Sequence, residues 1–575
     1  MNTVVSKYEK PLSIIYRKRT PELIIASAVV VIGIIVSYVL LVRDQNILLY
    51  YGDSISHLLI SRRLVDSIIP GLAQLGGVWL PMTHIFLSPF VINDFLFHTG
   101  FAGTIVSIVC TAITAVACFR IVKFQFNSVP AGLLASSIFF MNPSVIYMGI
   151  VPMMEAPFMM FFMLSVYYVQ KWYYIYKAGE GTWNQYRTVL KCGLVVSAAS
   201  LTRYEGWMLP FGLIVILAII QLIIVRRKEW RYRFEAILLV AIIFGSMGIM
   251  MWVLWNTVIF KDPLYFATGP YSAQVQANSR TFNEDLKLDP IKSSSIIFDV
   301  AIEMYGMPVF VISSLGIVTY LYIGRKEKTL SFSLLTIIML MLPTLVDFIA
   351  MVQGSGEIYP VREGWFNGRY LIFLAPLFAF SSVSLVIFIS RKKKKMLIIM
   401  PIVIIIIASY IFTILDQPIE RGKVVALKDP VVSPGESQHV ANETGKILRD
   451  EYVAVETGKI LKTAYEGGHV VLFAQLSHID RIIFFSNLPL KTFIDVTSGH
   501  YWRTSEETPW VYGKYVILEK PTDVFTMRSY DPLRDIVGYW HANEATLMEH
   551  YKVIYENQYF KILEKTEKTE KPTNS

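Results

Sequence analysis

Cysteine is almost absent from this 575-residue chain, which contains only Cys110, Cys118 and Cys192. All three fall in or beside long hydrophobic runs, and none lies in the polar C-terminal part. Disulfide-stabilised extracellular domains and thiolate metal sites both need several cysteines at close spacings. The sequence therefore indicates neither a disulfide framework nor a thiolate metal site.

Charged residues are also scarce, at 17% of the chain, whereas hydrophobic residues make up 54%. Apolar runs of about twenty residues, the length that spans a bilayer, recur as far as residue 415. This composition predicts a polytopic membrane protein. The formal net charge of +9 comes largely from Lys and Arg between the runs, where they set membrane orientation. We therefore expect no nucleic-acid partner.

The hydrophobic runs predict eleven membrane helices. The first begins at Thr20, where a hydroxyl cap, a proline and an acid follow one another, and it lacks the cleavage site of a signal peptide. The remaining ten are expected at about 98–119, 130–150, 153–170, 188–202, 206–225, 235–256, 297–323, 330–350, 369–390 and 396–415. Prolines at 143, 152 and 157 are expected to shorten or break the third and fourth helices.

Every second loop in this scheme is rich in Lys and Arg, which assigns those loops and the N-terminus to the cytoplasm. An odd number of helices then places the outer loop 43–97 and residues 416–575 together on the other face. We expect a multi-pass protein of the cell membrane with a cytoplasmic N-terminus and an extracytoplasmic C-terminal domain.

The fold class that follows is mostly α, a membrane helical bundle over residues 1–415 with a soluble α/β domain over 416–565. Strand-like runs at His469–Phe473, Tyr515–Leu518 and Tyr551–Glu564 belong to that domain. The sequence ETGKIL occurs twice, thirteen residues apart, and the end from 566 to 575 has a disordered composition.

The outer loop opens with an acid ahead of a helical pattern. In YYGDSISHLLISRRLVD, from Tyr50 to Asp66, the apolar side chains recur at helical spacing and Asp53 lies at the start. The pattern predicts an amphipathic helix that lies at the bilayer surface and holds a carboxylate beside lipid headgroups.

Charged residues at the outer helix ends are the candidate functional residues, because lipid makes unpaired charge costly. If Asp53 and Glu155 meet, two carboxylates face one cavity, which suits a general base or a divalent metal ion. Each acid has the alternative role of capping a helix. No cofactor is certain; the possible divalent metal has Asp53, Glu155 and His57 as candidate ligands.

Arg203 and Arg369 lie at the outer boundary, and each is followed by a tyrosine. A guanidinium there can bind phosphate, which suggests an anionic lipid. The alternative is an internal salt bridge from Arg203 to Glu205 or Glu155. The remaining candidates for binding are Tyr204, Glu205, Tyr370, His57, His84 and Trp79. An isolated histidine more often forms an ordinary hydrogen bond.

Five short motifs in this order resemble a known family: YGDSISHL, GLAQLGGVWLPMTH, MEAP, LTRYEGW and GRYLIFLAP. Between Tyr50 and Pro376 the chain is similar to membrane glycosyltransferases of the GT-C fold. These include the dolichyl-phosphate-mannose protein mannosyltransferase-like group and the lipid A aminoarabinose transferase. Such enzymes transfer a sugar from a polyprenyl-phosphate carrier, usually with inversion, to a protein or glycolipid on the non-cytoplasmic side.

The resemblance implies a role for each outer-face residue. Asp53 matches the general base, Glu155 the second acid that orients acceptor or metal, and Arg203 and Arg369 the contacts to lipid phosphate. Two features depart from related families. Protein mannosyltransferases carry an acidic pair where this chain has Asp53 and Ser54, and no WWDYG motif of oligosaccharyltransferases occurs in residues 416–575. Transfer of a single sugar is therefore expected.

Two other functions remain open at this point. A lipid flippase or transporter would need polar residues near the bilayer midplane, whereas the charges here gather at one face. A non-catalytic scaffold that binds polyprenyl lipid is the second alternative. It would be favoured if Asp53 and Glu155 lay more than about 15 Å apart, beyond direct or water-bridged contact.

Overall fold

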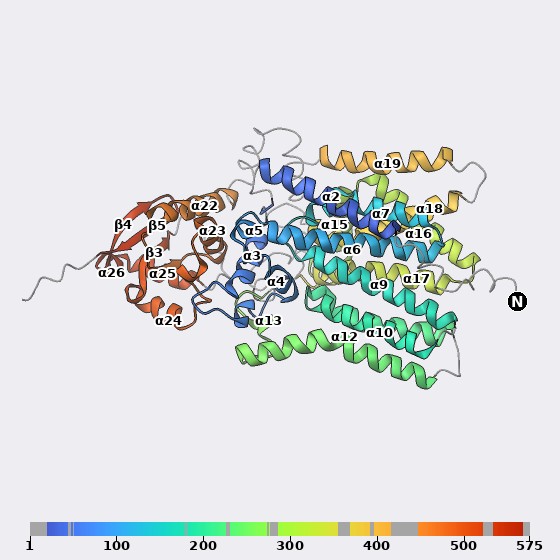
Figure 1. Cartoon of the computed structure of the whole chain (residues 1–575), viewed down its shortest axis with the longest axis horizontal. Helices are drawn as coiled ribbons and strands as arrows, with labels where there is room; N and C mark the ends of the chain where they lie inside the picture. The colour runs from blue at the N-terminus through green and yellow to red at the C-terminus, as the bar shows by residue number, and fades with distance from the viewer. Residues whose placement is uncertain are drawn as a thin grey trace, which may run out of the picture.

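The computed structural model describes residues 20–43, 48–49, 51–178, 181–225, 231–272, 275, 286–354, 368–390, 396–415, 447–520 and 533–566. Three parts follow one another along its long axis (Figure 1): a helical bundle, a small layer built from the loop between α2 and α6, and a C-terminal domain. We call the middle part the loop layer; it comprises residues 48–49 and 51–100. The charged outer-face motifs converge where it meets the bundle.

The bundle consists of long helices and the short turns that join them. Its elements are α2 (Thr20–Arg43), α6 (Phe101–Phe126), α7 (Val129–Phe140), α8 (Pro143–Met148), α9 (Glu155–Ala178), α10 (Thr182–Ser200), η4 (Tyr204–Trp207), α11 (Met208–Ile219), the π-turn η5 (Ile220–Val225), α12 (Arg231–Phe260), α13 (Tyr265–Thr268), α15 (Pro290–Tyr305), α16 (Met307–Lys326), α17 (Leu330–Val352), η8 (Gly368–Leu374), α18 (Ala375–Ser390) and α19 (Met396–Leu415).

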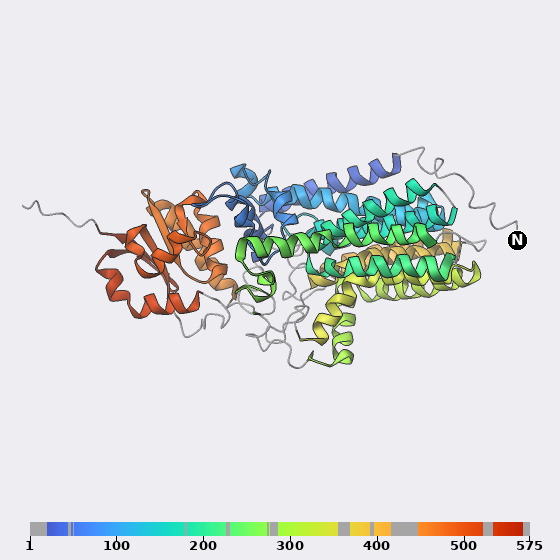
Figure 2. The same cartoon turned by 90° about the horizontal axis from the view of Figure 1, so that it is seen from below.

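Seven helical segments in the described part of the chain are long and apolar enough to cross a membrane. They are Thr20–Arg43, Phe101–Phe126, Tyr204–Leu222, Phe234–Phe260, Met307–Lys326, Leu330–Val352 and Gly368–Ser390. Helices α9 and α10 run beside them in two perpendicular views (Figures 1 and 2). The chain is therefore an integral membrane protein. The eleven predicted runs all fall on helices, but length and apolarity alone select seven.

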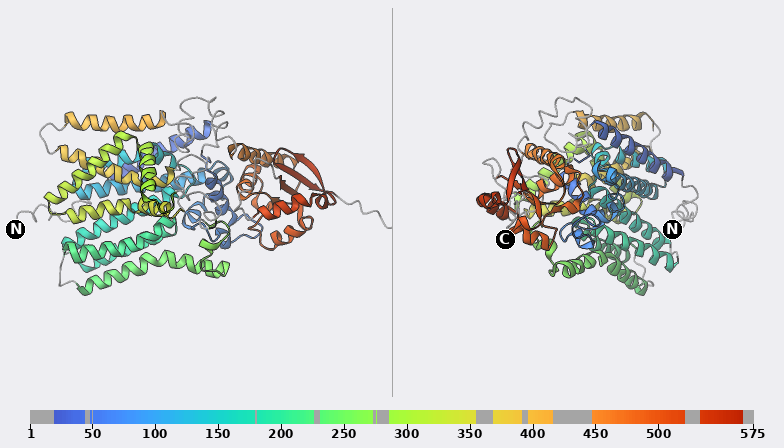
Figure 3. Two further views of the ribbon diagram at one scale, coloured as in Figure 1. Left: turned by 180° about the vertical axis from the view of Figure 1, so that it is seen from behind. Right: turned by 60° about the vertical axis from the view of Figure 1, so that its left-hand side comes forward.

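Two predicted spans are interrupted. The run 130–150 forms α7 and α8, because Asn142 caps a new helix that starts at Pro143, as expected from the proline. The prediction of one span over 297–323 is wrong. Gly306 has φ 80° and ends α15, so that α16 begins in a new direction. Helix α15 lies crosswise to the bundle, which the view from behind shows clearly (Figure 3, left).

The loop layer contains α3 (Gly52–Arg63), η3 (Leu72–Leu75), α4 (Met82–Leu87) and α5 (Asp94–His98). The predicted helix behind Asp53 is present, but its surroundings differ from an amphipathic helix on a bilayer. Its polar residues Ser54, Ser61 and Arg63 are buried together with its apolar ones. The reason is that α3 lies between the bundle and the C-terminal domain, so both of its faces are covered.

The C-terminal domain is an α/β domain, as predicted. Its sheet has the order β2-β1-β3-β5-β4, with β1, β2 and β3 parallel and β5 antiparallel to both neighbours. The elements are α22 (Ile447–Ala464), β1 (His469–Phe473), α23 (Leu476–Ser486), η9 (Leu490–Thr492), β2 (Phe493–Ile494), α24 (His500–Glu507), η10 (Pro509–Val511), β3 (Gly513–Glu519), α25 (Arg534–Ala542), α26 (Glu544–Met548), β4 (Tyr551–Glu556) and β5 (Phe560–Lys565).

Several predictions fall on residues outside the described part. These are the N-terminal tail before Thr20, the basic segments 226–228 and 391–395, most of the first ETGKIL copy, and the tail after Thr566. The three predicted strand regions are confirmed. The two-residue strand β2 was not predicted, since it is too short to show an alternating pattern.

Candidate functional site

Four charged side chains meet where the bundle joins the loop layer. Asp53 is in the first turn of α3 and Glu155 is the first residue of α9, where the positive end of a helix stabilises a carboxylate. Arg203 immediately precedes η4, and Arg369 is the second residue of η8. The four motifs predicted to share one face thus come together.

Arg369 holds both acids. Its Nη1 donates to Asp53 Oδ2 at 2.5 Å, and its Nε lies 3.9 Å from Glu155 Oε1. Because both distances are to one planar guanidinium, the carboxyl groups lie much closer than the 15 Å that would have favoured a scaffold. Glu155 is 1% exposed, whereas the side chain of Asp53 keeps 39% of its surface accessible. Only Asp53 of the two acids is thus open to an incoming molecule.

Arg203 forms the internal salt bridge that was the alternative to phosphate binding. Its Nη1 donates to Glu155 Oε1 at 2.9 Å, and its Nε and Nη2 donate to Glu205 Oε1 at 3.0 and 2.5 Å. All three guanidinium nitrogens therefore contact carboxylates, and Arg203 is only 7% exposed. This geometry suits fixing Glu155 in place better than binding a phosphate.

Aromatic rings complete the ion-pair network. The guanidinium carbons of Arg203 and Arg369 lie 5.3 and 5.2 Å from the centre of the Tyr370 ring. Arg369 also lies over Tyr51, at 5.6 Å. Such contacts stabilise a cation and restrict its orientation. Tyr370 therefore belongs to the site as a spacer between the two arginines.

Tyr204 and Glu205 point to different partners although they are adjacent. Glu205 binds Arg203, while the Tyr204 hydroxyl donates to the carbonyl of Val78 in the loop layer. Gly206 permits the tight turn, since a Cβ there would lie 2.5 Å from the carbonyl oxygen of Ala199. Tyr204 thus joins the bundle to the loop layer.

The buried side chains of His57 and His84 and the partly exposed Trp79 form a cluster beside this network. His57 Nδ1 and His84 Nε2 are 2.9 Å apart, and the Trp79 ring centre is 4.6 Å from that of His57. Burial lowers the pKa of His57 to about 4, although the negative charges of Asp53 and Glu155 act to raise it. Burial also lowers the pKa of His84. Both rings are therefore neutral at physiological pH, and the N–H of one ring donates a hydrogen bond to the nitrogen of the other.

The protonation state of Asp53 is set by two opposing effects. Burial raises the pKa of its carboxyl, but the charge and the hydrogen bond of Arg369, together with smaller contributions from His57 and Arg203, lower it by more. The net result is a pKa below the ordinary value. Asp53 is thus ionised at neutral pH, the form in which a carboxylate accepts a proton.

Asp347 is a functional candidate that the sequence reasoning missed. It lies in α17, is 7% exposed, and its Oδ2 has no hydrogen-bond partner within the described residues. Arg203 and Glu205 are the charged groups that act on it. The sequence feature that could have identified it is its position: it is an acid within the apolar run 330–350, four residues after Pro343.

The candidate metal ligands do not converge. Among the described residues, no three His, Cys, Asp or Glu side chains form a group that could hold a metal ion. Asp53 and Glu155 are both bound by arginine, and His57 is bound by His84. The site as a whole contains three carboxylates and two guanidiniums, so it has a surplus of negative charge before Asp347 is counted.

Comparisons with known proteins agree with this architecture. Residues 26–262 match the family model of dolichyl-phosphate-mannose-protein mannosyltransferases. ArnT from Cupriavidus metallidurans, solved with undecaprenyl phosphate, aligns over 94% of this chain and 98% of its own, with 10% identity and a TM-score of 0.54. Its apo structure gives 0.51 over 89% and 92%. A search of curated proteins found no significant match.

An oligosaccharyltransferase from Archaeoglobus fulgidus, tethered to an acceptor peptide, aligns with 10% identity and a TM-score of 0.43. This chain spans 66% of its length, and 59% of a second structure of it. The likeness to ArnT confirms the predicted GT-C fold, and the family match confirms the predicted resemblance to glycosyltransferases. The roles of individual residues stay predictions.

Proposed function

We propose that this chain, whose residues 26–262 match a mannosyltransferase family model and whose fold is that of ArnT, is a membrane glycosyltransferase. It would transfer a single sugar from a polyprenyl-phosphate carrier to a hydroxyl group of a protein or glycolipid. The observation that carries this proposal is that one guanidinium, Arg369, holds both Asp53 and Glu155.

Asp53 is the proposed general base. Its Oδ2 accepts the hydrogen bond from Arg369 and its side chain is 39% exposed, so Oδ1 is the oxygen proposed to take the proton of the acceptor hydroxyl. The acceptor oxygen then bonds to the anomeric carbon while the bond from that carbon to the phosphate oxygen breaks. Polyprenyl phosphate leaves with the electron pair, and the proton stays on Asp53 until solvent removes it.

Arg369 is the proposed phosphate contact. It has 12% of its side chain accessible and lies beside the half-exposed Asp53, whereas Arg203 is enclosed by carboxylates. A positive charge at this place would stabilise the charge that grows on the departing phosphate. Arg203 is assigned a different role from the one first expected, that of fixing Glu155.

Glu155 is proposed to orient the acceptor or the sugar. Its Oε1 contacts Arg203 and Arg369, while its Oε2 is buried and has no hydrogen-bond partner within the described residues. Because Glu155 is 1% exposed, it would act on the acceptor or sugar through Arg369, whose guanidinium it contacts. Trp79, which is partly exposed beside the buried His57, is the ring on which a sugar could stack.

The proposed location is the cell membrane, with the site and the C-terminal domain on the non-cytoplasmic side. Arg120 and Lys123, near the C-terminal end of α6, lie at the end of the bundle opposite the loop layer. ArnT was solved with undecaprenyl phosphate, which supports a polyprenyl-phosphate donor for this chain. The charges of the site gather at one end of the bundle, an arrangement that suits transfer better than transport across the midplane.

The proposal is tested with the full-length protein in lipid nanodiscs and a panel of polyprenyl-phosphate sugars, measuring which donor is consumed. Asp53→Asn should lower transfer by about 10²–10⁴-fold, the usual contribution of a general base. Binding of the donor should persist, because the asparagine leaves Arg369 in place.

Asp94→Asn is the matched control, since Asp94 lies in the same loop layer and its side chain is 74% exposed. It should transfer sugar at the wild-type rate. Full activity of Asp53→Asn would refute the assignment of the base. Consumption of no donor by the wild-type protein, with intact binding of polyprenyl phosphate, would favour the scaffold instead.

A further inference from the structure

Helix α3 has one face toward the C-terminal domain and another toward the proposed active site. Gly52, Ser56 and Arg63 are spaced by four and seven residues, so they share one side of the helix. Asp53 and His57 lie on the adjacent side, where they contact Arg369 and His84. A single rigid element therefore joins the two regions.

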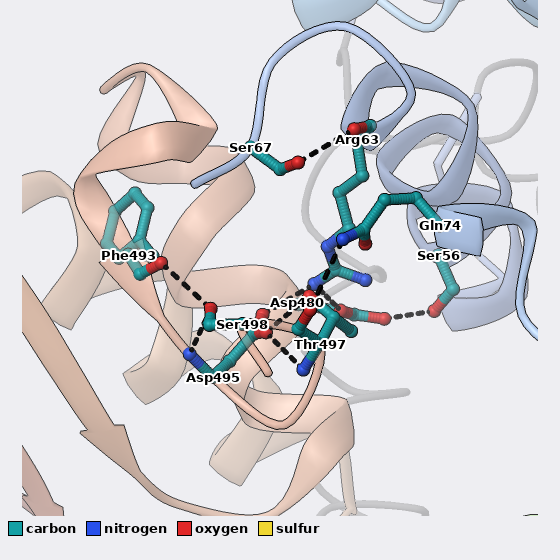
Figure 4. Close-up of polar contacts among 9 residues, drawn as sticks. All are labelled: Ser56, Arg63, Ser67, Gln74, Asp480, Phe493, Asp495, Thr497 and Ser498. Carbon is teal, nitrogen blue, oxygen red and sulfur yellow. Dashed lines mark hydrogen bonds and ion pairs between the residues drawn. The ribbon is translucent and has the colours of Figure 1, made fainter. Parts of the chain in front are cut away.

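Polar contacts bind the first face of α3 to the domain (Figure 4). Arg63 Nη2 donates to Asp495 Oδ2 at 2.9 Å and lies 3.5 Å from Asp480 Oδ1. The Ser56 hydroxyl donates to Asp480 Oδ2. Near the start of the helix, Arg481 lies so close to Gly52 that a Cβ there would be 3.3 Å from its Nη1. The contacts thus extend along the whole length of α3.

The acids that receive Arg63 are themselves fixed. The amide and hydroxyl of Thr497 donate to Asp495 Oδ1 at 2.8 and 2.6 Å, so both oxygens of that carboxylate are bound. Arg63, Asp480 and Asp495 are 6%, 4% and 3% exposed. Ion pairs that are shielded from water and held by further hydrogen bonds have a defined geometry.

Apolar packing reinforces the same junction. Leu58 and Leu59 of α3 belong to one hydrophobic cluster with Ile479 and Ile483 of α23. Phe97 of the loop layer packs on Phe484, with ring centres 5.2 Å apart. Because packed cores resist small displacements, α3 and the C-terminal domain should move as one body.

We propose that Arg63 is a positioning residue for the proposed reaction. With Asp480, Asp495 and Ser56 it sets the rotation and depth of α3, and thereby the place of Asp53 against Arg369. Ten residues separate Arg63 from Asp53, about 15 Å along a helix. The C-terminal domain is on this basis part of the support of the active site. This inference depends on the proposed role of Asp53.

The test is Arg63→Gln in the full-length protein in nanodiscs. We expect kcat to fall on the order of 10–100-fold, since a displacement of about 1 Å at a reacting group has effects of that size. KM for the polyprenyl-phosphate sugar should stay within about twofold, because Arg369 is untouched. The acid limb of the pH profile should move to higher pH, as Asp53 loses part of its contact with Arg369.

Three further variants separate positioning from general instability. Ser56→Ala removes only the hydrogen bond to Asp480 and should cause a smaller change of the same kind. Arg63→Lys should recover part of the loss. Lys561→Gln breaks an ion pair with Glu544, 2.5 Å long, inside the C-terminal domain and away from α3. It should leave kcat and the pH profile unchanged.

Hydrogen exchange gives a readout that needs no activity. Amides of residues 53–57 should exchange faster in Arg63→Gln and Ser56→Ala than in Lys561→Gln. Unchanged exchange and kinetics in Arg63→Gln, or an equal loss in Lys561→Gln, would overturn the inference. Faster exchange with Asp53→Asn still fully active would refute the proposed base while leaving the coupling of α3 to the domain intact.

Discussion

Arg369 and Asp53 form an ion pair although 316 positions separate them in the sequence. The pair joins the start of η8 in the bundle to the start of α3 in the loop layer. It keeps Asp53 ionised and at the same time places a positive charge beside the proposed leaving group. One contact thus serves both the proposed base and the proposed phosphate site.

Replacing Arg369 with Gln should shift the pH dependence of transfer. Arg369 lowers the pKa of Asp53, so without it the pKa rises and less of the carboxylate is ionised on the acid side. The acid limb of kcat/KM should move to higher pH, measured as initial rates from pH 4 to 8. Arg369→Lys should restore much of the limb position but bind donor more weakly, because a lysine binds phosphate as a point charge. An unmoved limb would contradict the ion pair as the cause.

Replacing Arg203 with Met should destabilise the protein. Glu155 and Glu205 would then be left buried without their main partner, and removal of one member of a buried pair costs about 3–5 kcal/mol. A large fall in the thermal unfolding temperature is the expected result, with activity lost through Glu155. Weaker donor binding at an unchanged unfolding temperature would instead support a direct phosphate contact.

Asp347 should show the opposite behaviour. Its Oδ2 is a buried acceptor with no partner in the described part of the chain. Asp347→Asn should therefore leave the unfolding temperature unchanged or raise it, whereas transfer should fall if the acid is retained for function. Thr344→Val, which removes another buried unpartnered oxygen of α17, is the matched control and should keep wild-type transfer. Equal rates in both variants would remove Asp347 from the site.

The sequence predicted that the four charged residues share one end of the bundle, but not which of them contact one another. The alternation of basic loops was enough to place Asp53, Glu155, Arg203 and Arg369 at one end, because the side on which a loop lies depends only on the number of spans that precede it. Which arginine holds which acid depends on side-chain geometry in folded turns, so the internal role of Arg203 stayed an open alternative.

Long-range docking was equally invisible in the sequence. Ser56 and Arg63 looked like the polar side of a surface helix, since their partners Asp480 and Asp495 follow more than four hundred positions later. The break between α15 and α16 depends on Gly306, which has a positive φ, and on Pro308 in the first turn of α16, inside an apolar run long enough to be taken for one span. Local patterns thus gave the elements, and tertiary contacts gave their surroundings.

The histidine pair should make the protein less stable in mild acid. The pKa of buried His57 is about 4 in the folded state and near 6.5 when unfolded, so between these values the unfolded chain binds more protons. Stability is then fully present above pH 6.5 and is lost as the pH falls toward 4, by about 3 kcal/mol at most for this residue. His84, whose pKa is also lowered by burial, adds to the effect.

The unfolding temperature, measured from pH 7.5 to 4, should show this loss of stability. His57→Phe, which retains a ring against Trp79, should make the unfolding temperature depend less steeply on pH. His500→Phe, an exposed change in the C-terminal domain, is the control. An equal slope in His57→Phe and wild-type protein would show that the pair is not what makes the protein sensitive to acid.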